Sequence, residues 1–453
     1  MSAERLPRIG LVSLGCPRNL VDSEVMLGVL ERRGFRRTAD AREAEVIVVN
    51  TCGFIDAAKR ESIDTILEMA RHKEAGTCRR LVVTGCLAQR YGEQLRREIP
   101  EIDAMLGVAD IERIAAACRL DPGETPGLTG LPAYLPTHLT PRVLSTPPGS
   151  AYLKISEGCD HECAFCVIPK IRGRMRSRPA ASLVEESRRL AARGVRELNL
   201  VGEDTSAYGR DRDGEETLGA LLRALARVEG IEWIRVLYAY PFQLGDDVLE
   251  AMAAERRICR YLDVPLQHAD RQILKRMRRG GDAGSLLRFL ERLRAAVPEI
   301  TLRSTFIVGF PGEREAHYRR LLEFVREARL DRVGVFAYSH EESTAAHDLP
   351  DDVPAAVKQE RRERLMLLQQ GIALAANRRL LGRHERVLVE PPAPDATGRG
   401  RLESQAPEVD GCVRLAGARA RSGTFATVRI DSAGPYDLFG TIVPDPRPHA
   451  EPV

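Results

Sequence analysis

Hydrophobic residues in the first third of the chain fall into short runs of valine, isoleucine and leucine, separated by longer amphipathic stretches. The apolar runs are Ile9–Gly15, Glu45–Thr51 and Leu81–Gly85, and the amphipathic stretches are Ser23–Arg33, Ala57–Arg71 and Tyr91–Ile99. Buried strands that alternate with helices are typical of βαβ units, which build a parallel sheet. We therefore predict an α/β domain with a parallel sheet over residues 1–120.

Each of these apolar runs leads directly into a cysteine: Cys16, Cys52 or Cys86. Ligands of open parallel sheets collect outside the carboxyl ends of the strands. We therefore expect the three cysteines to meet at one edge of the sheet, although more than thirty residues separate each from the next. Cysteine thiolates hold iron–sulfur clusters, so the pattern predicts a cluster with three protein ligands. The alternative is three buried cysteines at strand ends that bind nothing.

A stretch rich in proline and glycine, residues 121–150, indicates a linker. Strand and helix patterns then alternate about six times. The predicted strands are Ala151–Ser156, Glu197–Val201, Ile234–Ala239, Tyr261–Pro265, Thr301–Val308 and Arg332–Tyr338, and helices such as Ser182–Arg193, Leu218–Val228 and Ser285–Val297 lie between them. Six βα units are two short of a closed eight-stranded barrel, so we predict an open (β/α)6 partial barrel. With the long helical stretch Val353–Leu381, this domain covers residues 151–381.

From residue 382 the pattern changes to short alternating runs separated by turns that contain glycine and proline. The predicted strands are Arg386–Val389, Gly411–Val413, Thr424–Ile430 and Leu438–Val443. Residues 382–453 are therefore predicted to form a small β-barrel. From Arg383 onward the chain has nine arginines against ten acidic residues, whereas RNA-binding modules are usually basic. The charge favours a protein partner over RNA.

Composition narrows the class of protein. The 453-residue chain has no run near the ~20 apolar residues of a membrane span, and its first residues lack the apolar core of a signal peptide. We therefore expect a cytoplasmic protein with no membrane part. Ten cysteines in such a protein indicate metal or redox use more than disulfides. Cys78, Cys118, Cys259 and Cys412 fall outside any pattern, and we interpret them as incidental apolar residues.

A tight cysteine motif follows the first predicted barrel strand. Cys159, Cys163 and Cys166 are spaced C-x3-C-x2-C, with Phe165 just before the third. Three thiolates from one loop can converge on one inorganic centre, and a cluster of four irons would keep one iron free for a ligand that is not protein. The alternative is a zinc site with His161 as the fourth ligand. His161 lies inside the loop, however, and not at the separate pair spacing that zinc sites prefer.

Polar or glycine-rich groups follow other predicted barrel strands: Gly202 and Glu203 the second, Gln267 and His268 the fourth, and Gly309 the fifth. Barrels of this kind place function at the carboxyl ends of their strands. We therefore predict that Gly202, Glu203, Gln267 and Gly309 line a cofactor site beside the cysteine loop. Each signal also has a plainer interpretation, since a glutamate often starts a helix, a glycine often forms a turn, and His268 is more typical of a structural hydrogen bond.

The basic segment Ile171–Arg178 directly follows the cysteine motif. Its arginines form either a solvated surface or a site for an acidic substrate or ligand carboxylate. The sequence leaves both interpretations open, and we assign no side chain as a catalytic acid or base.

With both cysteine sets in view, the chain resembles the methylthiotransferases of the radical S-adenosylmethionine (SAM) superfamily along nearly its whole length. The cysteine sets carry this resemblance. Five segments are more similar to the branch that modifies ribosomal protein uS12 than to the tRNA-modifying branch: Ser13–Glu24, Lys154–Asp160, Ile168–Arg174, Asp263–His268 and Arg332–Ser339. Glu203 departs from the pattern, because the resemblance leads us to expect glutamine before Asp204 and Thr205.

The resemblance implies two 4Fe-4S clusters, one on Cys16, Cys52 and Cys86 and the other on Cys159, Cys163 and Cys166. It implies SAM on the second cluster, beside Phe165, Gly202, Glu203, Gln267 and Gly309, and a C-terminal TRAM domain. The implied reaction places a methylthio group on the β-carbon of an aspartate in uS12. It uses two SAM molecules, one as the methyl donor and one as the source of a 5′-deoxyadenosyl radical.

No side chain can deprotonate the unactivated β-carbon of an aspartate at neutral pH, so the implied reaction needs a radical cofactor. It also implies a partner protein that supplies electrons. Two other functions fit parts of the pattern. One is a tRNA methylthiotransferase acting on an adenosine, and the other is an iron–sulfur electron-transfer protein without enzymatic activity. Electron transfer needs neither an open iron nor a nucleoside pocket, which disfavours the second.

Overall fold

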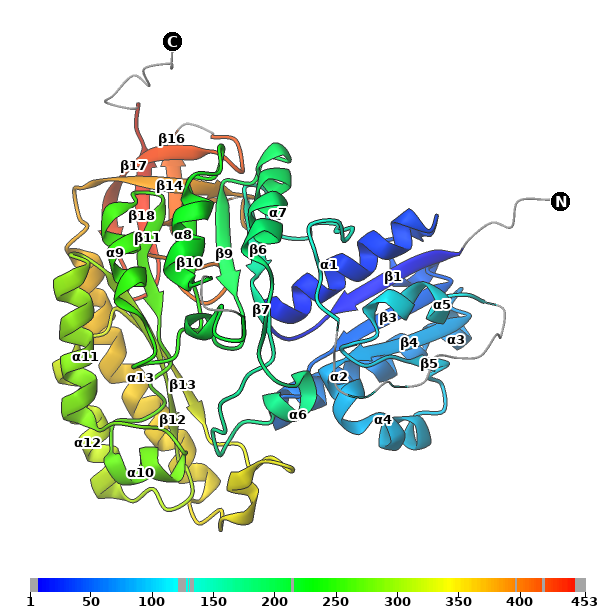
Figure 1. The fold of residues 1–453 in the computed structure, drawn as a ribbon, viewed down its shortest axis with the longest axis horizontal. Coiled ribbons are helices and arrows are strands. Elements are labelled where there is room, and N and C mark those ends of the chain that lie inside the picture. The colour runs from blue at the N-terminus through cyan, green and yellow to red at the C-terminus, as the bar shows by residue number, and fades with distance from the viewer. Residues whose placement is uncertain are drawn as a thin grey trace.

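A computed structural model describes residues 7–120, 128, 130, 134–212, 216–395, 397–417 and 420–444 of the chain. Much of the predicted linker, between residues 121 and 133, therefore lies outside the described residues. Three units follow one another along the chain: a parallel sheet domain, a second parallel sheet that curves into a partial barrel, and a small closed β-barrel (Figure 1). This architecture confirms the predicted fold class.

The N-terminal domain is a parallel sheet covered by helices on both faces. Its elements are β1 (Arg8–Ser13), α1 (Pro17–Arg32), β2 (Arg36–Arg37), β3 (Val46–Thr51), α2 (Asp56–Ala70), α3 (His72–Ala75), β4 (Arg80–Gly85), α4 (Cys86–Glu98), β5 (Ala104–Met105) and α5 (Ile114–Ala117). The strand order is β2-β1-β3-β4-β5. One apolar cluster joins the sheet to α1 and α5 and another joins it to α2 and α4, so β3 and β4 are buried along their whole length.

Two helices of this domain begin earlier than the hydrophobic pattern predicts. Helix α1 starts at Pro17, where the ring of proline suits the first helical turn, and not at Ser23. Helix α4 starts at Cys86, not at Tyr91, because Gly85 turns the strand directly into the helix at φ 95°. A β-carbon at Gly85 would lie 2.4 Å from the Asn50 Oδ1 atom, so no other residue fits there. Cys16 and Cys86 therefore lie at helix N-termini.

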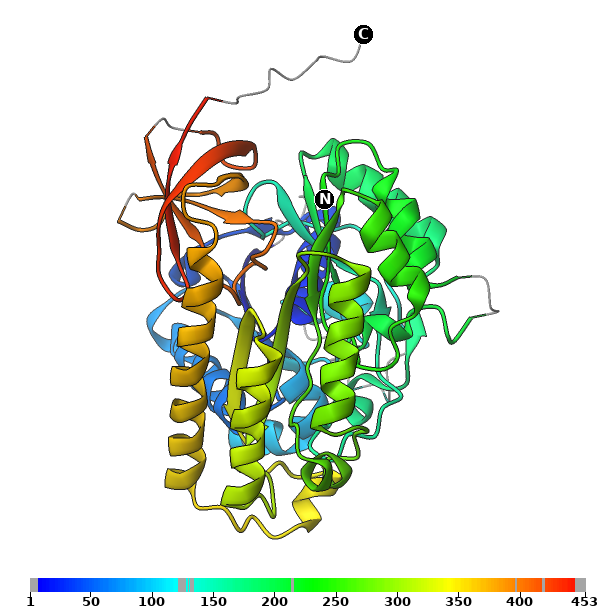
Figure 2. The same cartoon turned by 90° about the vertical axis from the view of Figure 1, so that its left-hand side faces the viewer.

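The central domain is a six-stranded parallel sheet with strand order β6-β9-β10-β11-β12-β13. Its elements are β6 (Ser150–Lys154), β7 (Ser156–Glu157), α6 (Ile168–Arg172), β8 (Arg176–Ser177), α7 (Ala180–Ala192), β9 (Glu197–Val201), α8 (Leu218–Ala226), β10 (Trp233–Val236), α9 (Asp246–Ala254), β11 (Ile258–Asp263), α10 (Arg271–Arg276), α11 (Ala283–Ala296), β12 (Thr301–Val308), α12 (Glu315–Ala328), β13 (Arg332–Ala337) and α13 (Ala355–Arg378). Figure 2 shows α11, α12 and α13 side by side on the outer face. The six predicted strands are present: β9 and β12 have the predicted bounds, and the ends of the other four differ from the prediction by at most three residues.

The C-terminal domain is a closed barrel of five strands in the order β14-β15-β16-β18-β17. They are β14 (His384–Glu390), β15 (Gly398–Leu402), β16 (Val413–Gly417), β17 (Phe425–Ala433) and β18 (Leu438–Ile442). The sequence predicts β14, β17 and β18, but its third predicted strand, Gly411–Val413, meets β16 only at Val413. It misses β15, because two of the five residues of that strand are glycines, which are rare in strands. A β-carbon at Gly400 would lie 2.4 Å from Val387 Cγ1, so close packing of the neighbouring strand requires the glycine that hides the strand in the sequence.

The C-terminal barrel is fixed to the central domain by buried charges. The Arg401 guanidinium donates to both oxygens of Glu197, at 3.0 and 2.5 Å, and Arg235 donates to the same carboxylate at 2.9 Å. Arg235 also donates to the Glu403 carbonyl. Glu197 and Arg235 are fully buried, so these ion pairs join the start of β9 to β15 without contact with water.

Replacing Glu197 with glutamine is expected to lower the free energy of unfolding at pH 7 by about 3–5 kcal/mol, because the buried Arg235 loses its ion-pair partner and Arg401 keeps only Glu390. Burial alone would raise the pKa of Glu197, but Arg401 and Arg235 hold that pKa below its ordinary value of 4.5. A depressed carboxyl pKa contributes stability above pH 4.5 that is lost as the pH falls further. The difference between the two proteins should therefore shrink in acid, as measured by urea unfolding from pH 7 to pH 3.

Arg399 is the matched control for this experiment, because it lies two residues from Arg401 on β15 and its side chain is 40% exposed. Its partner Glu390 keeps the ion pair with Arg401 when Arg399 is removed. Arg399→Ala should change the free energy of unfolding by less than about 1 kcal/mol. Equal losses for Glu197→Gln and Arg399→Ala would contradict the buried role of Glu197.

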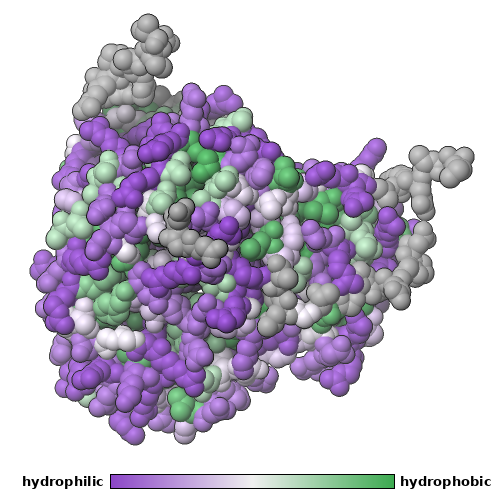
Figure 3. Space-filling model, viewed as in Figure 1, coloured by the Kyte–Doolittle hydropathy of each residue, from purple (hydrophilic) through white to green (hydrophobic). Residues whose placement is uncertain are grey.

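The surface is mostly hydrophilic on the face shown in Figure 3, with apolar side chains in small scattered groups. Within the described residues, none of the helices combines the length and the apolar character that crossing a membrane requires.

Candidate functional site

The structure brings Cys16, Cys52 and Cys86 to one edge of the N-terminal sheet, after the adjacent strands β1, β3 and β4. The loops that carry them pack together through glycines. A β-carbon at Gly15 would lie 3.1 Å from Cys52 Sγ, and one at Gly53 would lie 3.0 Å from the Cys86 carbonyl carbon. All three cysteines are free thiols. The expected meeting of three strand-end cysteines is present in the geometry.

Arginines lie beside this cysteine set. The Nη2 atom of Arg172 is 3.6 Å from Cys86 Sγ, and Arg18 follows Cys16 by two residues in the first turn of α1. Burial alone would raise the pKa of Cys16, but Arg18 and Arg172 hold that pKa below its ordinary value of 9.0. Burial raises the pKa of Cys86 to about 12. Positive charge at this edge suits thiolate ligands.

The second cysteine set is a compact loop after β6 and β7. The loop folds on itself and on its neighbours: the Cys166 amide donates to the Cys163 carbonyl at 3.0 Å, and the Cys159 amide donates to the Gly173 carbonyl at 3.1 Å. The His161 amide points at Cys159 Sγ, 3.4 Å away, and Arg279 Nη1 is 3.6 Å from Cys163 Sγ. The sulfurs therefore face hydrogen-bond donors, as the sulfurs of a bound cluster do.

The donor chemistry of both sets fits an iron–sulfur cluster. Burial raises the pKa of Cys159 and of Cys166 to about 12, so binding a metal would displace their protons. A cavity of about 530 Å³ opens beside Cys163 and Cys166. Within the described part of the chain, no three His, Cys, Asp or Glu side chains are grouped as ligands of a single metal ion. A four-iron cluster is larger than one ion and takes each ligand on a separate iron.

Glu203 lies at the carboxyl end of β9 with its side chain 3% exposed. Neither of its oxygens receives a hydrogen bond from the described residues. Its nearest cations are Arg18, whose Nε is 3.4 Å away, and Arg172, whose Nε is 3.7 Å away. The preceding residue, Gly202, packs so tightly that a β-carbon there would lie 2.4 Å from Ser156 Oγ. A buried, unsatisfied carboxylate of this kind fits a ligand that donates hydrogen bonds.

The other predicted cofactor residues lie along the same edge of the sheet. Gln267 has φ 71° and a buried Oε1 atom that accepts no hydrogen bond from the described residues. Phe165 packs against an apolar cluster that includes Phe310 and Tyr338. Gly309 has φ 72°, and a β-carbon there would lie 2.3 Å from Lys358 Cγ, so the approach of α13 already explains this glycine.

His161, His268 and the basic segment Ile171–Arg178 contact neighbouring residues in the structure. His161 Nε2 lies 2.7 Å from Asp204 Oδ2, and the His161 ring stacks on Tyr240. His268 is fully buried, and its Nδ1 accepts from the Asp270 amide, in the manner of a structural residue. The basic segment is not uniformly solvated, because Arg172 and Arg178 are each 1% exposed.

Buried charges join the two cysteine sets. Helix α6 starts two residues after Cys166, and its Arg172 pairs with Asp22 of α1, at 3.1 Å, and with Glu157. Lys154 donates to the same two carboxylates. Arg172 thus reaches from the barrel cysteine loop to Cys86 of the other domain. Figure 1 shows α1 against β6 at this junction.

Comparison with known proteins gives three successive family matches. Residues 8–107 match the family described as Uncharacterized protein family UPF0004, residues 153–325 match the Radical SAM superfamily, and residues 381–443 match the TRAM domain. Each match falls on one of the three units of the fold.

Whole-chain relatives decide the family. A protein of Pelotomaculum thermopropionicum is 49% identical over 441 residues, which are 96% of this chain and 99% of that protein. A protein of Desulforudis audaxviator is 50% identical over 438 residues, 96% of this chain and 97% of that protein. Both carry the name ribosomal protein uS12 methylthiotransferase RimO. The chain belongs to the RimO family.

A solved structure with a similar fold is more distant than these RimO-family relatives. The radical SAM methyltransferase TsrM of Kitasatospora setae, with cobalamin and a 4Fe-4S cluster bound, aligns with a TM-score of 0.55 over 74% of this chain and 72% of that one. The two sequences are 16% identical, so this likeness shows a shared fold alone.

Several residues at the junction of this RimO-family chain are missed by the sequence analysis. The meeting of the two domains buries three charged residues and brings them their ion-pair partners: Arg18, Asp22 and Lys154. The sequence does hold a signal for Asp22, because this charged residue stands among the apolar positions of α1. In the structure it is 5% exposed. Burial raises the pKa of Asp263, at the end of β11, to about 6.

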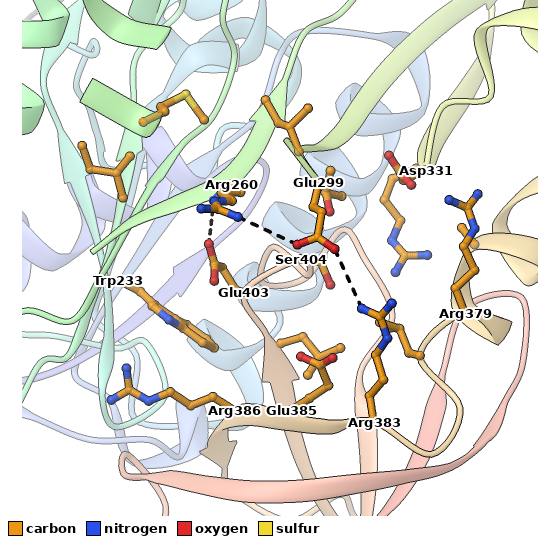
Figure 4. A pocket seen from close by; sticks show the side chains of 18 of the residues that line it. Trp233, Arg260, Glu299, Asp331, Arg379, Arg383, Glu385, Arg386, Glu403 and Ser404 are labelled. Carbon is orange, nitrogen blue, oxygen red and sulfur yellow. Dashed lines mark hydrogen bonds and ion pairs between the residues drawn. The ribbon is translucent and has the colours of Figure 1, made fainter. Parts of the chain in front are cut away.

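A cavity of about 670 Å³ lies at the amino-terminal ends of the barrel strands, opposite the ends that the cysteine loop follows (Figure 4). It is lined by the first residues of β10, β11, β12 and β13, including Trp233 and Arg332, and by the start of the C-terminal barrel. Glu299 lies between Arg260 and Arg383, at 3.9 and 4.0 Å. The cysteine loop follows the other end of the strands, so this cavity is separate from the cysteine site.

Proposed function

We propose that this protein is a radical-SAM methylthiotransferase that adds a methylthio group to the β-carbon of an aspartate in ribosomal protein uS12. The cofactors are two 4Fe-4S clusters, held by Cys16, Cys52 and Cys86 and by Cys159, Cys163 and Cys166, and SAM. The observation that carries the proposal is the contact of Arg172 with Cys86, because Arg172 belongs to the helix that follows the barrel cysteine loop and reaches a cysteine of the other set. Membership of the RimO family supports uS12 as the substrate.

When bound, the clusters and SAM supply the radical, the methyl group and the sulfur, none of which a side chain provides. The residues of the chain position these groups and exclude water. Glu203 and Gln267 offer unsatisfied oxygens to the amino and hydroxyl groups of SAM. Val21 of α1 packs with Tyr152 and Tyr261 of the barrel, so the junction is closed by apolar side chains. Closure protects a reactive centre from side reactions.

The protein acts in the cytoplasm, on uS12 either free or in the ribosome, and takes electrons from a reductant protein. The charge of the C-terminal barrel supports a protein substrate over tRNA, because nine arginines stand against ten acidic residues from Arg383 onward, whereas RNA-binding modules are usually basic.

The experiment is to incubate the reconstituted enzyme with SAM and a reductant, with uS12 and a tRNA pool in parallel, and to measure intact masses. We expect a methylthio-sized mass gain on uS12 that maps to one aspartate. A gain confined to an adenosine of tRNA would move the protein to the tRNA-modifying branch. SAM cleavage without a gain on either substrate would contradict the proposed substrate while leaving the fold and cofactors in place.

A further inference from the structure

Arg18 is the residue that connects the first cysteine set to the rim of the barrel. It lies in the first turn of α1, two residues after Cys16. Its Nη1 atom donates to the Gly202 carbonyl at 2.9 Å, and its Nε faces Glu203 at 3.4 Å. Its guanidinium lies over the Tyr238 ring, 4.6 Å from the centroid. One side chain of the N-terminal domain thus contacts the ends of two barrel strands, β9 and β10.

The geometry around Arg18 is specific for a guanidinium. A planar fork can donate to a carbonyl, face a carboxylate and stack on an aromatic ring at the same time, which a lysine ammonium cannot. The side chain is 15% exposed and Glu203 is 3% exposed, so water screens the pair little. Tyr238 takes φ 61°, an uncommon conformation for a residue with a bulky side chain, and this places its ring under Arg18.

Glu203 also faces Arg172, at 3.7 Å, and Arg172 in turn reaches Cys86 at 3.6 Å. A series of three charged side chains therefore runs from the neighbourhood of Cys16 through the barrel rim to Cys86: Arg18, Glu203 and Arg172. Arg172 has further partners in Asp22 and Glu157 that hold it in place. Within the described residues, every ion pair and hydrogen bond of the Arg18 side chain is with the barrel rim.

We propose that Arg18 is a positioning residue of methylthio transfer: through Gly202, Glu203 and Tyr238 it fixes the Cys16 end of α1 relative to the barrel rim. The inference rests on the proposed function and adds to it. In a productive turnover, the hydrogen lost by the substrate carbon leaves in 5′-deoxyadenosine. A carbon–sulfur bond forms at that carbon, and the released electron passes to the centre that held the sulfur. Each methylthio group therefore accounts for one 5′-deoxyadenosine from the radical step.

Removing Arg18 should disturb the transfer more than the formation of the radical, because the barrel cysteines and their loop belong to one domain. Arg18→Ala is expected to raise the ratio of 5′-deoxyadenosine to methylthio-uS12, at saturating SAM, by about 10- to 100-fold, the range expected when a remote change misplaces reacting groups. Arg18→Lys keeps the charge but not the fork, and should raise the ratio less. Arg32→Ala is the matched control, since Arg32 is exposed at the other end of α1. It should leave the ratio unchanged.

A second readout needs neither substrate nor clusters. In the full chain without metal, Arg18→Ala should speed hydrogen–deuterium exchange in the first turn of α1 and in the segment after β9, whereas Arg32→Ala should not. An unchanged product ratio in both Arg18 variants, or unchanged exchange at both segments in Arg18→Ala, would overturn the inference. If the unaltered enzyme gave no methylthio-uS12, the proposed function would fail, and the exchange measurement would still decide the Arg18 contact.

Discussion

Replacing any one of Cys159, Cys163 and Cys166 with alanine is expected to reduce SAM cleavage by about a thousandfold or more, to background, because residues that act as one unit lose their function together. The three thiols come from one loop, in which the Cys166 amide donates to the Cys163 carbonyl and the Cys159 amide donates to the Gly173 carbonyl. Losing one thiol would leave a cluster with two of its three protein ligands. The measurement is 5′-deoxyadenosine formed in the presence of SAM and dithionite, quantified by liquid chromatography.

The control for this series is Cys259→Ala, which removes a buried thiol from β11 in the same domain. It should cleave SAM at near the unaltered rate, because Cys259 lies in an apolar cluster and not in the cysteine loop. Undiminished 5′-deoxyadenosine from Cys159→Ala, Cys163→Ala or Cys166→Ala would show that this loop does not hold the SAM-binding cluster.

Alanine at Cys16, Cys52 or Cys86 is expected to have the opposite pattern: SAM cleavage is retained, and methylthio-uS12 falls below about 1% of the unaltered yield. These cysteines lie at the edge of the N-terminal sheet, and the barrel loop keeps its own hydrogen bonds without them. The measurement compares 5′-deoxyadenosine with modified uS12 in the same reaction.

Cys78→Ala is the matched control for the N-terminal set, because Cys78 is a buried free thiol of the same domain at the opposite end of β4 from Cys86. It should yield modified uS12 normally. Normal yields from Cys16→Ala, Cys52→Ala or Cys86→Ala would refute a second cluster on these residues.

Local signals in the sequence single out both cysteine sets, whose role as cluster ligands stays a prediction. The barrel motif is a single loop, and its spacing is visible without a fold. The N-terminal set required only the inference that parallel strands end at the same edge, and the order of β1, β3 and β4 in the sheet meets that condition. The fold class was predictable from the hydrophobic pattern, because strands buried on both faces of a parallel sheet give short but continuous apolar runs.

The charged contacts between domains could not be predicted in this way. Arg18 and Arg172 are ordinary basic residues in the sequence, and their burial depends on which carboxylates a distant segment brings to them. The pair Glu197 and Arg401 is 204 residues apart, and β15, which carries Arg401, contains glycines that argue against a strand. Tertiary packing overrides local propensity at such positions.

Helix boundaries illustrate a smaller gap between pattern and structure. The apolar periodicity of α1 becomes regular only after Ser23, yet Pro17 already fixes the first turn. The earlier start sets Cys16 at the helix N-terminus and places Arg18 in the first turn, where it contacts Gly202 of the barrel.

The most direct test of the two-cluster account is the iron content of four reconstituted proteins, measured together with their Mössbauer spectra. The account predicts about eight irons per unaltered chain, all in 4Fe-4S clusters, and about four when the three cysteines of either set are replaced by alanine. Replacing all six should leave almost none. About four irons in the unaltered chain, or no loss from one of the two triple variants, would contradict the claim that each set holds its own cluster.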